Sequence, residues 1–73
     1  MNEYILLCIH RKDNVIIGVY TGTLEEVNIN KEIISKYIEL GDKELRVEKL
    51  IQGLNSDSTA IEITQAYGYL LQE

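Results

Sequence analysis

Glu3-Tyr-Ile-Leu-Leu-Cys-Ile-His-Arg11 and Val15-Ile-Ile-Gly-Val-Tyr-Thr21 are the two stretches that decide the predicted fold. Both consist largely of β-branched, aliphatic and aromatic residues, the types enriched in strands. Lys12-Asp13-Asn14 separates them, and Asp and Asn accept the left-handed conformation that a tight turn needs. The two stretches therefore predict a β-hairpin at the start of the chain.

The hairpin is apolar on both faces, which has consequences for assembly. Alternation along the first strand gives two apolar sets, Ile5, Leu7 and Ile9 on one face and Tyr4, Leu6 and Cys8 on the other. One helix covers one face, and a bare second face would exceed the apolar patches that soluble monomers usually show. A chain of this length also buries only about 60% of its surface on folding. The sequence thus predicts a homo-oligomer with the first or second strand at its interface.

A helix is predicted within residues 24–40. Thr23-Leu-Glu-Glu26 matches the capping box, in which the threonine side chain and the glutamate satisfy each other's backbone amides. Gly41 is suited to end the helix because glycine readily takes positive φ. The helical stripe expected to face the sheet consists of Ile33, Ile34, Tyr37 and Ile38.

The C-terminal third fits two patterns. The pattern of Leu45, Val47 and Ile51 matches a strand, with Lys49 as the exception, but Val47, Leu50, Ile51 and Leu54 match a helix. Residues 59–69 are rich in Ile, Thr and Tyr, which favours a second hairpin. The prediction is therefore a single α+β domain over residues 1–73, in the order ββαββ. The alternative is ββααα, in which Ala60, Ile63, Tyr67 and Leu70 form a helical stripe.

The stretch from Val15 to Val27 resembles a phrase found in small uncharacterised bacterial and phage proteins of ββαβ type. In those proteins a hairpin ends in Gly-Val-Tyr or Gly-Val-Phe, and a helix then opens with Glu-Glu. The resemblance covers about 13 residues and implies the order of the first elements. It carries over no functional residue.

Charge and composition exclude several classes of function. The formal net charge is −5, from 12 acidic and 7 basic residues, and no basic stripe is present. Direct nucleic-acid binding is therefore not expected, whereas a basic protein partner is. The apolar runs are too short to span a membrane, and the N-terminus lacks the positive flank of a signal peptide. With one cysteine, the chain is predicted to be cytoplasmic.

The residues that could take part in chemistry are better explained as structural groups. Cys8 and His10 share a strand face and could pair as nucleophile and base, but a cysteine among apolar residues usually fills a core. Gly22-Thr23 precedes a helix without the lysine of a phosphate loop. The prediction is a protein that is not an enzyme, with no cofactor and no metal.

The functional prediction is a non-catalytic small acidic binding protein that regulates or inhibits a protein partner, in the manner of phage-encoded inhibitors of host machinery. The alternative is a homo-oligomer that binds or sequesters a small, nucleotide-like ligand. Tyrosines are favoured at interfaces because the ring buries while the hydroxyl finds a partner. The candidate interface comprises Tyr4, Leu6, Tyr20, Tyr67 and Tyr69, and the candidate acidic face comprises Glu25, Glu26 and Glu32.

Overall fold

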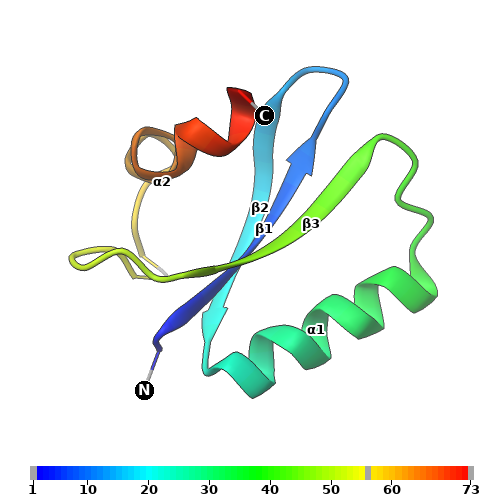
Figure 1. The fold of residues 1–73 in the computed structure, drawn as a ribbon, viewed down its shortest axis with the longest axis horizontal. Coiled ribbons are helices and arrows are strands. Elements are labelled where there is room, and N and C mark those ends of the chain that lie inside the picture. The colour runs from blue at the N-terminus through cyan, green and yellow to red at the C-terminus, as the bar shows by residue number, and fades with distance from the viewer. Residues whose placement is uncertain (1, 56, 73) are drawn as a thin grey trace.

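Three strands form one antiparallel sheet with helical structure on each face (Figure 1). The structure, a computed structural model, describes residues 2–55 and 57–72. Its elements are β1 (Tyr4–His10), β2 (Val15–Gly22), α1 (Leu24–Tyr37), β3 (Lys43–Lys49), α2 (Ala60–Tyr67) and the 3-10 helix η1 (Gly68–Gln72). The spatial order of the strands is β2-β1-β3, so β1 is central and the other two strands are edges.

The predicted hairpin is confirmed as β1 and β2. Asn14 in its turn has a φ of 56°, the left-handed conformation expected there. The register shifts where Cys8 opposes Gly18 but Ile9 opposes Ile16, so Ile17 is the extra residue of a β-bulge. The bulge bends the first half of β2 and leaves its second half regular.

The prediction of a second hairpin is wrong. Residues 43–49 do form a strand, but residues 60–72 form α2 and η1, so the order of elements is ββαβα with a terminal 3-10 turn. The alternative ββααα also fails, because β3 pairs with β1. A capping box at Thr59 and Glu62 starts α2, as Thr23 and Glu26 start α1. This signal outweighs the β propensity of the Ile and Thr residues that follow it.

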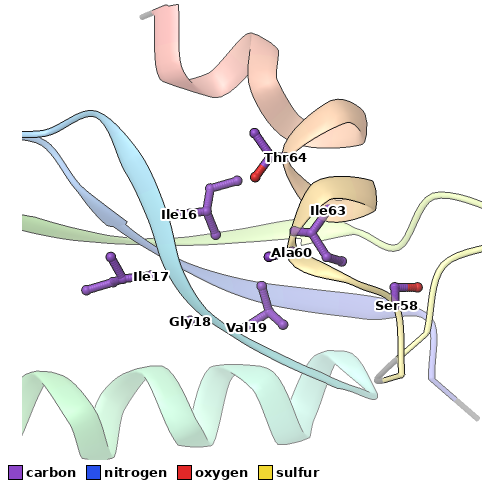
Figure 2. A pocket seen from close by; sticks show the side chains of 8 residues that line it. All are labelled: Ile16, Ile17, Gly18, Val19, Ser58, Ala60, Ile63 and Thr64. Carbon is purple, nitrogen blue, oxygen red and sulfur yellow. The ribbon is translucent and has the colours of Figure 1, made fainter.

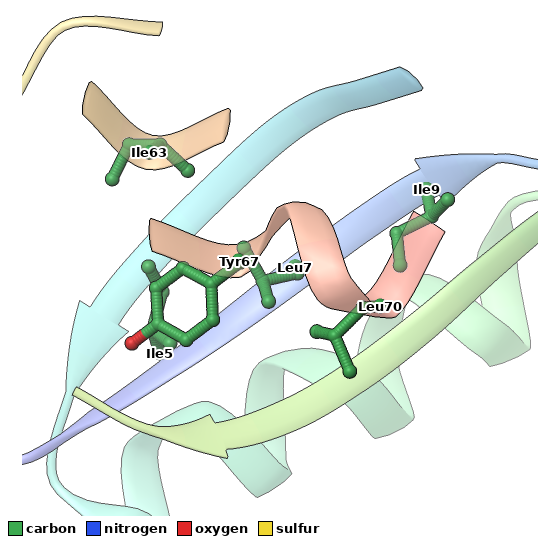
Figure 3. Packing of buried hydrophobic residues seen from close by; sticks show 6 residues of the cluster. All are labelled: Ile5, Leu7, Ile9, Ile63, Tyr67 and Leu70. Carbon is green, nitrogen blue, oxygen red and sulfur yellow. The ribbon is translucent and has the colours of Figure 1, made fainter. Parts of the chain in front are cut away.

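The larger part of the core lies between the sheet and the C-terminal segment. Figure 3 shows α2 and η1 lying across one face of the sheet, with the Tyr67 ring above Ile5. The expectation of a bare second face is therefore wrong, because the C-terminal helix covers it and β1 lies inside the sheet. The buried cluster consists of Ile5, Leu7, Ile9, Ile63, Tyr67 and Leu70.

The smaller part of the core lies between the sheet and α1. Its buried members are Leu6, Val27 and Leu45, with Ile34 packed against them. The helical stripe expected for α1 is thus only partly right, because Ile33, Tyr37 and Ile38 are exposed. Val27, seven residues or about two turns before Ile34, marks the face that contacts the sheet.

Polar contacts tie the C-terminal segment to the rest of the fold. The Tyr67 hydroxyl donates to the Lys49 carbonyl at 2.7 Å and accepts from the Ile51 amide at 2.9 Å. At the other end, Arg11 Nη1 donates to the Leu70 carbonyl at 3.0 Å, and Asn14 Nδ2 donates to the Leu71 carbonyl. These contacts hold α2 and η1 over the sheet face that they cover.

The two capping boxes should make the fold weaker in acid. The backbone amides of Thr23 and Thr59 donate to Glu26 and Glu62 at 2.9 and 3.0 Å, and these hydrogen bonds, with those of the threonine hydroxyls, lower the pKa of both glutamates. A lowered pKa in the folded state gives stability that is complete above the ordinary glutamate value and is lost as pH falls through the folded value.

We expect the free energy of unfolding, measured with urea at a series of pH values, to fall below about pH 4.3, the ordinary pKa of glutamate. Glu62→Gln should make that fall shallower. Glu32→Gln, outside both capping boxes, serves as the control and should leave it unchanged. Identical pH profiles for Glu62→Gln and the parent protein would show that this capping box does not contribute.

Candidate interaction site at the edge of the sheet

The two edges of the sheet differ sharply in chemistry. Five of the seven residues of β3 are charged, and its side chains form a network in which Glu44 accepts from Arg11 Nε at 2.7 Å. Arg46 extends the network to Glu48. Charged side chains along an edge strand discourage pairing with another chain. β2, Val-Ile-Ile-Gly-Val-Tyr-Thr-Gly, has no charged residue at all.

The outer edge of β2 faces solvent. Among the residues that the structure describes, β2 pairs only with β1, so the backbone amides and carbonyls of its other edge are left to solvent or to another chain. Val15, Ile17, Val19 and Tyr20 each expose 40–50% of their surface. An uncharged, apolar and unpaired edge is the arrangement that accepts an added strand.

The helix α1 extends this apolar edge sideways. β2 and β3 are parallel to each other, so α1 is a crossover connection, which in nearly all proteins is right-handed. Figure 2 looks onto the edge of β2, with α1 below the sheet and β3 behind β2. The directions of these three elements are those of a right-handed crossover. With Val27 and Ile34 facing the sheet, a turn of about 100° per residue directs Ile33 toward the β2 side of the helix.

Ile29 and Tyr37 lie one turn before and after Ile33 and continue the same stripe. The three side chains are between 47% and 74% exposed, so the β2 side of α1 is apolar and uncovered. Together with the edge of β2, these residues form one surface, called the β2 surface below. It comprises Val15, Ile17, Val19, Tyr20, Ile29, Ile33 and Tyr37.

A small cavity flanks β2 on each side of the sheet. The cavity toward α2, drawn in Figure 2, has a volume of about 180 Å³ and is lined by Ile16, Val19, Ala60, Ile63 and their neighbours. The cavity toward α1 has the same volume and an almost wholly apolar lining that includes Cys8 and Ile34. Neither lining contains a charged residue. Both are smaller than the 300 Å³ or more that small-molecule sites usually offer, but they match single side chains.

The structure divides the five residues of the candidate interface. Tyr20 and Tyr69 are exposed, and Tyr4 is half-buried. Leu6 and Tyr67 belong to the two cores, with 3% and 0% exposure, so they lie outside any exposed surface. Tyr69 lies beside Tyr67 on the C-terminal segment, with its hydroxyl 3.4 Å from Glu48, away from the β2 surface. Tyr20 is the one candidate that lies on the β2 surface.

The candidate acidic face is only partly assembled. Glu25, Glu26 and Glu32 are all exposed on α1, but Glu26 is engaged with the Thr23 amide in the capping box. Glu25 and Glu32 lie seven residues apart on the same side of the helix. Lys36 follows Glu32 by one turn, so this side carries mixed charge.

Cys8 and His10 do not form an activated pair. Burial raises the pKa of the Cys8 thiol, which keeps it protonated and weakly nucleophilic. His10 Nδ1 lies 3.0 Å from Asp13 in the hairpin turn. Within residues 2–55 and 57–72, no cluster of three or more His, Cys, Asp or Glu side chains could hold a metal ion.

No helix in the described part of the chain is long and apolar enough to cross a membrane. Comparisons with protein families, with curated proteins and with solved structures find no match for this chain. The candidate site therefore stands on its geometry.

Sequence reasoning missed the contribution of α1 to this site. The available signal was the spacing of Ile29, Ile33 and Tyr37, each one turn apart and offset from Val27 and Ile34. This spacing did not identify the exposed stripe, because Ile33 and Ile34 are adjacent and either could have faced the sheet. The absence of charged residues in β2 was visible in the sequence, but the position of β2 at an edge of the sheet was not.

Proposed function

We propose that this protein is a non-catalytic protein-binding module that regulates or inhibits its partner through the β2 surface. The observation that carries the proposal is the contrast between the two sheet edges. The β3 edge bears a network of charges, whereas the β2 edge is apolar, uncharged and unpaired in the described structure.

Strand addition explains why several features occur together. A segment laid along β2 would satisfy the free backbone groups of that edge, and its alternate side chains would point toward the two flanking cavities. Backbone pairing supplies affinity in such complexes, while the cavities select the side chains. Cavities of this size and lining favour one aliphatic side chain on each face of the added strand, at positions such as i and i+1 or i and i+3.

Two observations favour protein binding over the small-ligand alternative. The two cavities beside β2 are small, and their linings contain no cationic side chain for a phosphate. A wider depression of about 570 Å³ beside Arg11 and Lys43 is also lined by two acidic residues, which oppose the binding of a phosphate. The net charge of −5 also disfavours a nucleotide and favours a basic partner. The raised pKa of Cys8 supports a role that involves no covalent chemistry.

Val19→Lys tests the proposal directly. Val19 lies on β2, lines both cavities and exposes 40% of its surface, so the change adds charge to the edge without removing a buried group. We expect a partner captured from a lysate by the tagged parent protein to be lost with Val19→Lys. Circular dichroism should confirm that the variant remains folded.

The matched control is Ile61→Lys, which places the same charge on an exposed isoleucine of α2 outside the β2 surface. It should capture the partner as the parent does. Equal capture by all three proteins, or loss with Ile61→Lys alone, would contradict binding through β2.

A further inference from the structure

We infer that the partner seated on the β2 surface in the isolated protein is a second copy of this chain, with the two β2 strands paired antiparallel about a twofold axis. The inference rests on the proposed function, because it names the occupant of the same surface. It joins two sheets into one of six strands, in the order β3-β1-β2-β2-β1-β3. The regular second half of β2, from Gly18 to Gly22, would form the pairing, with Tyr20 at the axis.

The position of α1 fits this arrangement. A twofold axis perpendicular to the sheet keeps both α1 helices on one face, with their β2 sides toward each other. The helix lies closest to β1 and β2. With strands about 4.8 Å apart, a helix centred over the gap between β1 and β2 would lie about 10 Å from its symmetry mate. Packed helices are separated by about that distance, so the two stripes centred on Ile33 would meet.

The exposed area agrees with a dimer. The accessible surface of the chain is 4983 Å², compared with about 4,600 Å² expected for a folded monomer of 8.4 kDa. The seven side chains of the β2 surface expose on the order of 600 Å², at the upper end of single patches on soluble monomers. This area, which includes the exposed backbone of these residues, approaches the roughly 800 Å² that each partner of a stable complex buries.

The distribution of charge permits self-association despite the net charge of −5. No residue of β2 is charged, so the centre of the contact brings no like charges together. Antiparallel pairing also brings the acidic first turn of α1, with Glu25, toward the hairpin turn of the other copy, where Lys12 is exposed. The same turn also carries the exposed Asp13, so the two ends of the interface are of mixed charge.

Sedimentation of the full chain from micromolar to millimolar concentration tests the inference. We expect the parent protein to sediment as a dimer, and Ile33→Lys to weaken dimerisation more than about tenfold, because it places an unpaired charge in the interface. Ile61→Lys, the control on α2, should remain a dimer. A parent protein that is monomeric at every concentration would overturn the inference, as would a dimer that Ile33→Lys leaves intact.

A second measurement does not depend on weakening the dimer. A residue on the axis pairs with its own copy, with Cβ atoms about 5 Å apart, close to disulfide range. In a Cys8→Ser background, Tyr20→Cys should oxidise to a covalent dimer, whereas Ile61→Cys should stay monomeric under the same oxidant. Equal cross-linking of the two variants would contradict pairing along β2.

The two proposals can fail separately. If the parent protein is monomeric but Val19→Lys still abolishes capture of a different protein, the dimer is wrong and the proposed function stands. If the parent is a dimer through β2 and Val19→Lys causes no loss of any captured protein, self-association is the role of the surface. Regulation of another protein through this surface is then wrong.

Discussion

Tyr67→Ala should unfold the domain under conditions in which the parent protein is folded. Tyr67 is wholly buried between α2 and the sheet, and truncating a buried aromatic residue costs about 3–5 kcal/mol. A domain of 73 residues has a total stability of roughly 4–11 kcal/mol. The change also leaves the Ile51 amide and the Lys49 carbonyl without their hydrogen-bond partner.

Urea unfolding followed by circular dichroism measures this effect, and two variants separate its causes. Tyr67→Phe keeps the ring and removes the hydroxyl, so it should cost about 1–3 kcal/mol, the penalty for leaving buried polar groups unpaired. Tyr69→Ala, at the neighbouring exposed tyrosine, should cost much less than Tyr67→Ala. Equal losses at the two positions would show that the C-terminal segment is not packed as the structure has it.

Val27→Asp should release α1 from the sheet. Val27 is the one fully buried residue of α1, and an aspartate there would place a carboxylate without a partner among Leu6 and Leu45. A buried charge left unpaired costs about 3–5 kcal/mol. We expect loss of the cooperative unfolding transition, together with rapid hydrogen exchange along α1.

The matched control is Asn28→Asp, which adds the same carboxylate at the next, exposed position of the helix. It should change the free energy of unfolding by no more than about 0.5 kcal/mol, as surface substitutions usually do. If Val27→Asp were tolerated as well as the control, the face of α1 that contacts the sheet would have been misassigned.

The candidate site could be predicted only in part. Tyr20, predicted as an interface residue, lies on a strand that the local pattern made clear, and the structure leaves it exposed. The prediction of Leu6 and Tyr67 as exposed interface residues is wrong, because both are buried. Their burial depends on which elements cover each face of the sheet, and local pattern does not reveal this. The contribution of Ile33 was missed because two adjacent isoleucines fit the same helical period.

The sequence by itself determined the features that depend on neighbouring residues. The hairpin follows from two β-rich stretches around a turn, the start of α1 from its capping box, and the two-faced apolar character of β1 from alternation. These signals act over a few residues, so a reading of the chain captures them. The capping box at Thr59 belongs to the same class and was present in the sequence.

Only the tertiary structure decided the fate of the C-terminal third and the position of the open edge. Ile63 and Tyr67 share a face in a strand as well as in a helix, but Leu70 joins them on that face only in a helical arrangement. Packing of all three over the sheet therefore selects the helix. Strand order is likewise non-local. β1 pairs with β2 on one side and with β3 on the other. Because β3 pairs with β1 rather than with β2, the uncharged strand β2 remains at the edge of the sheet.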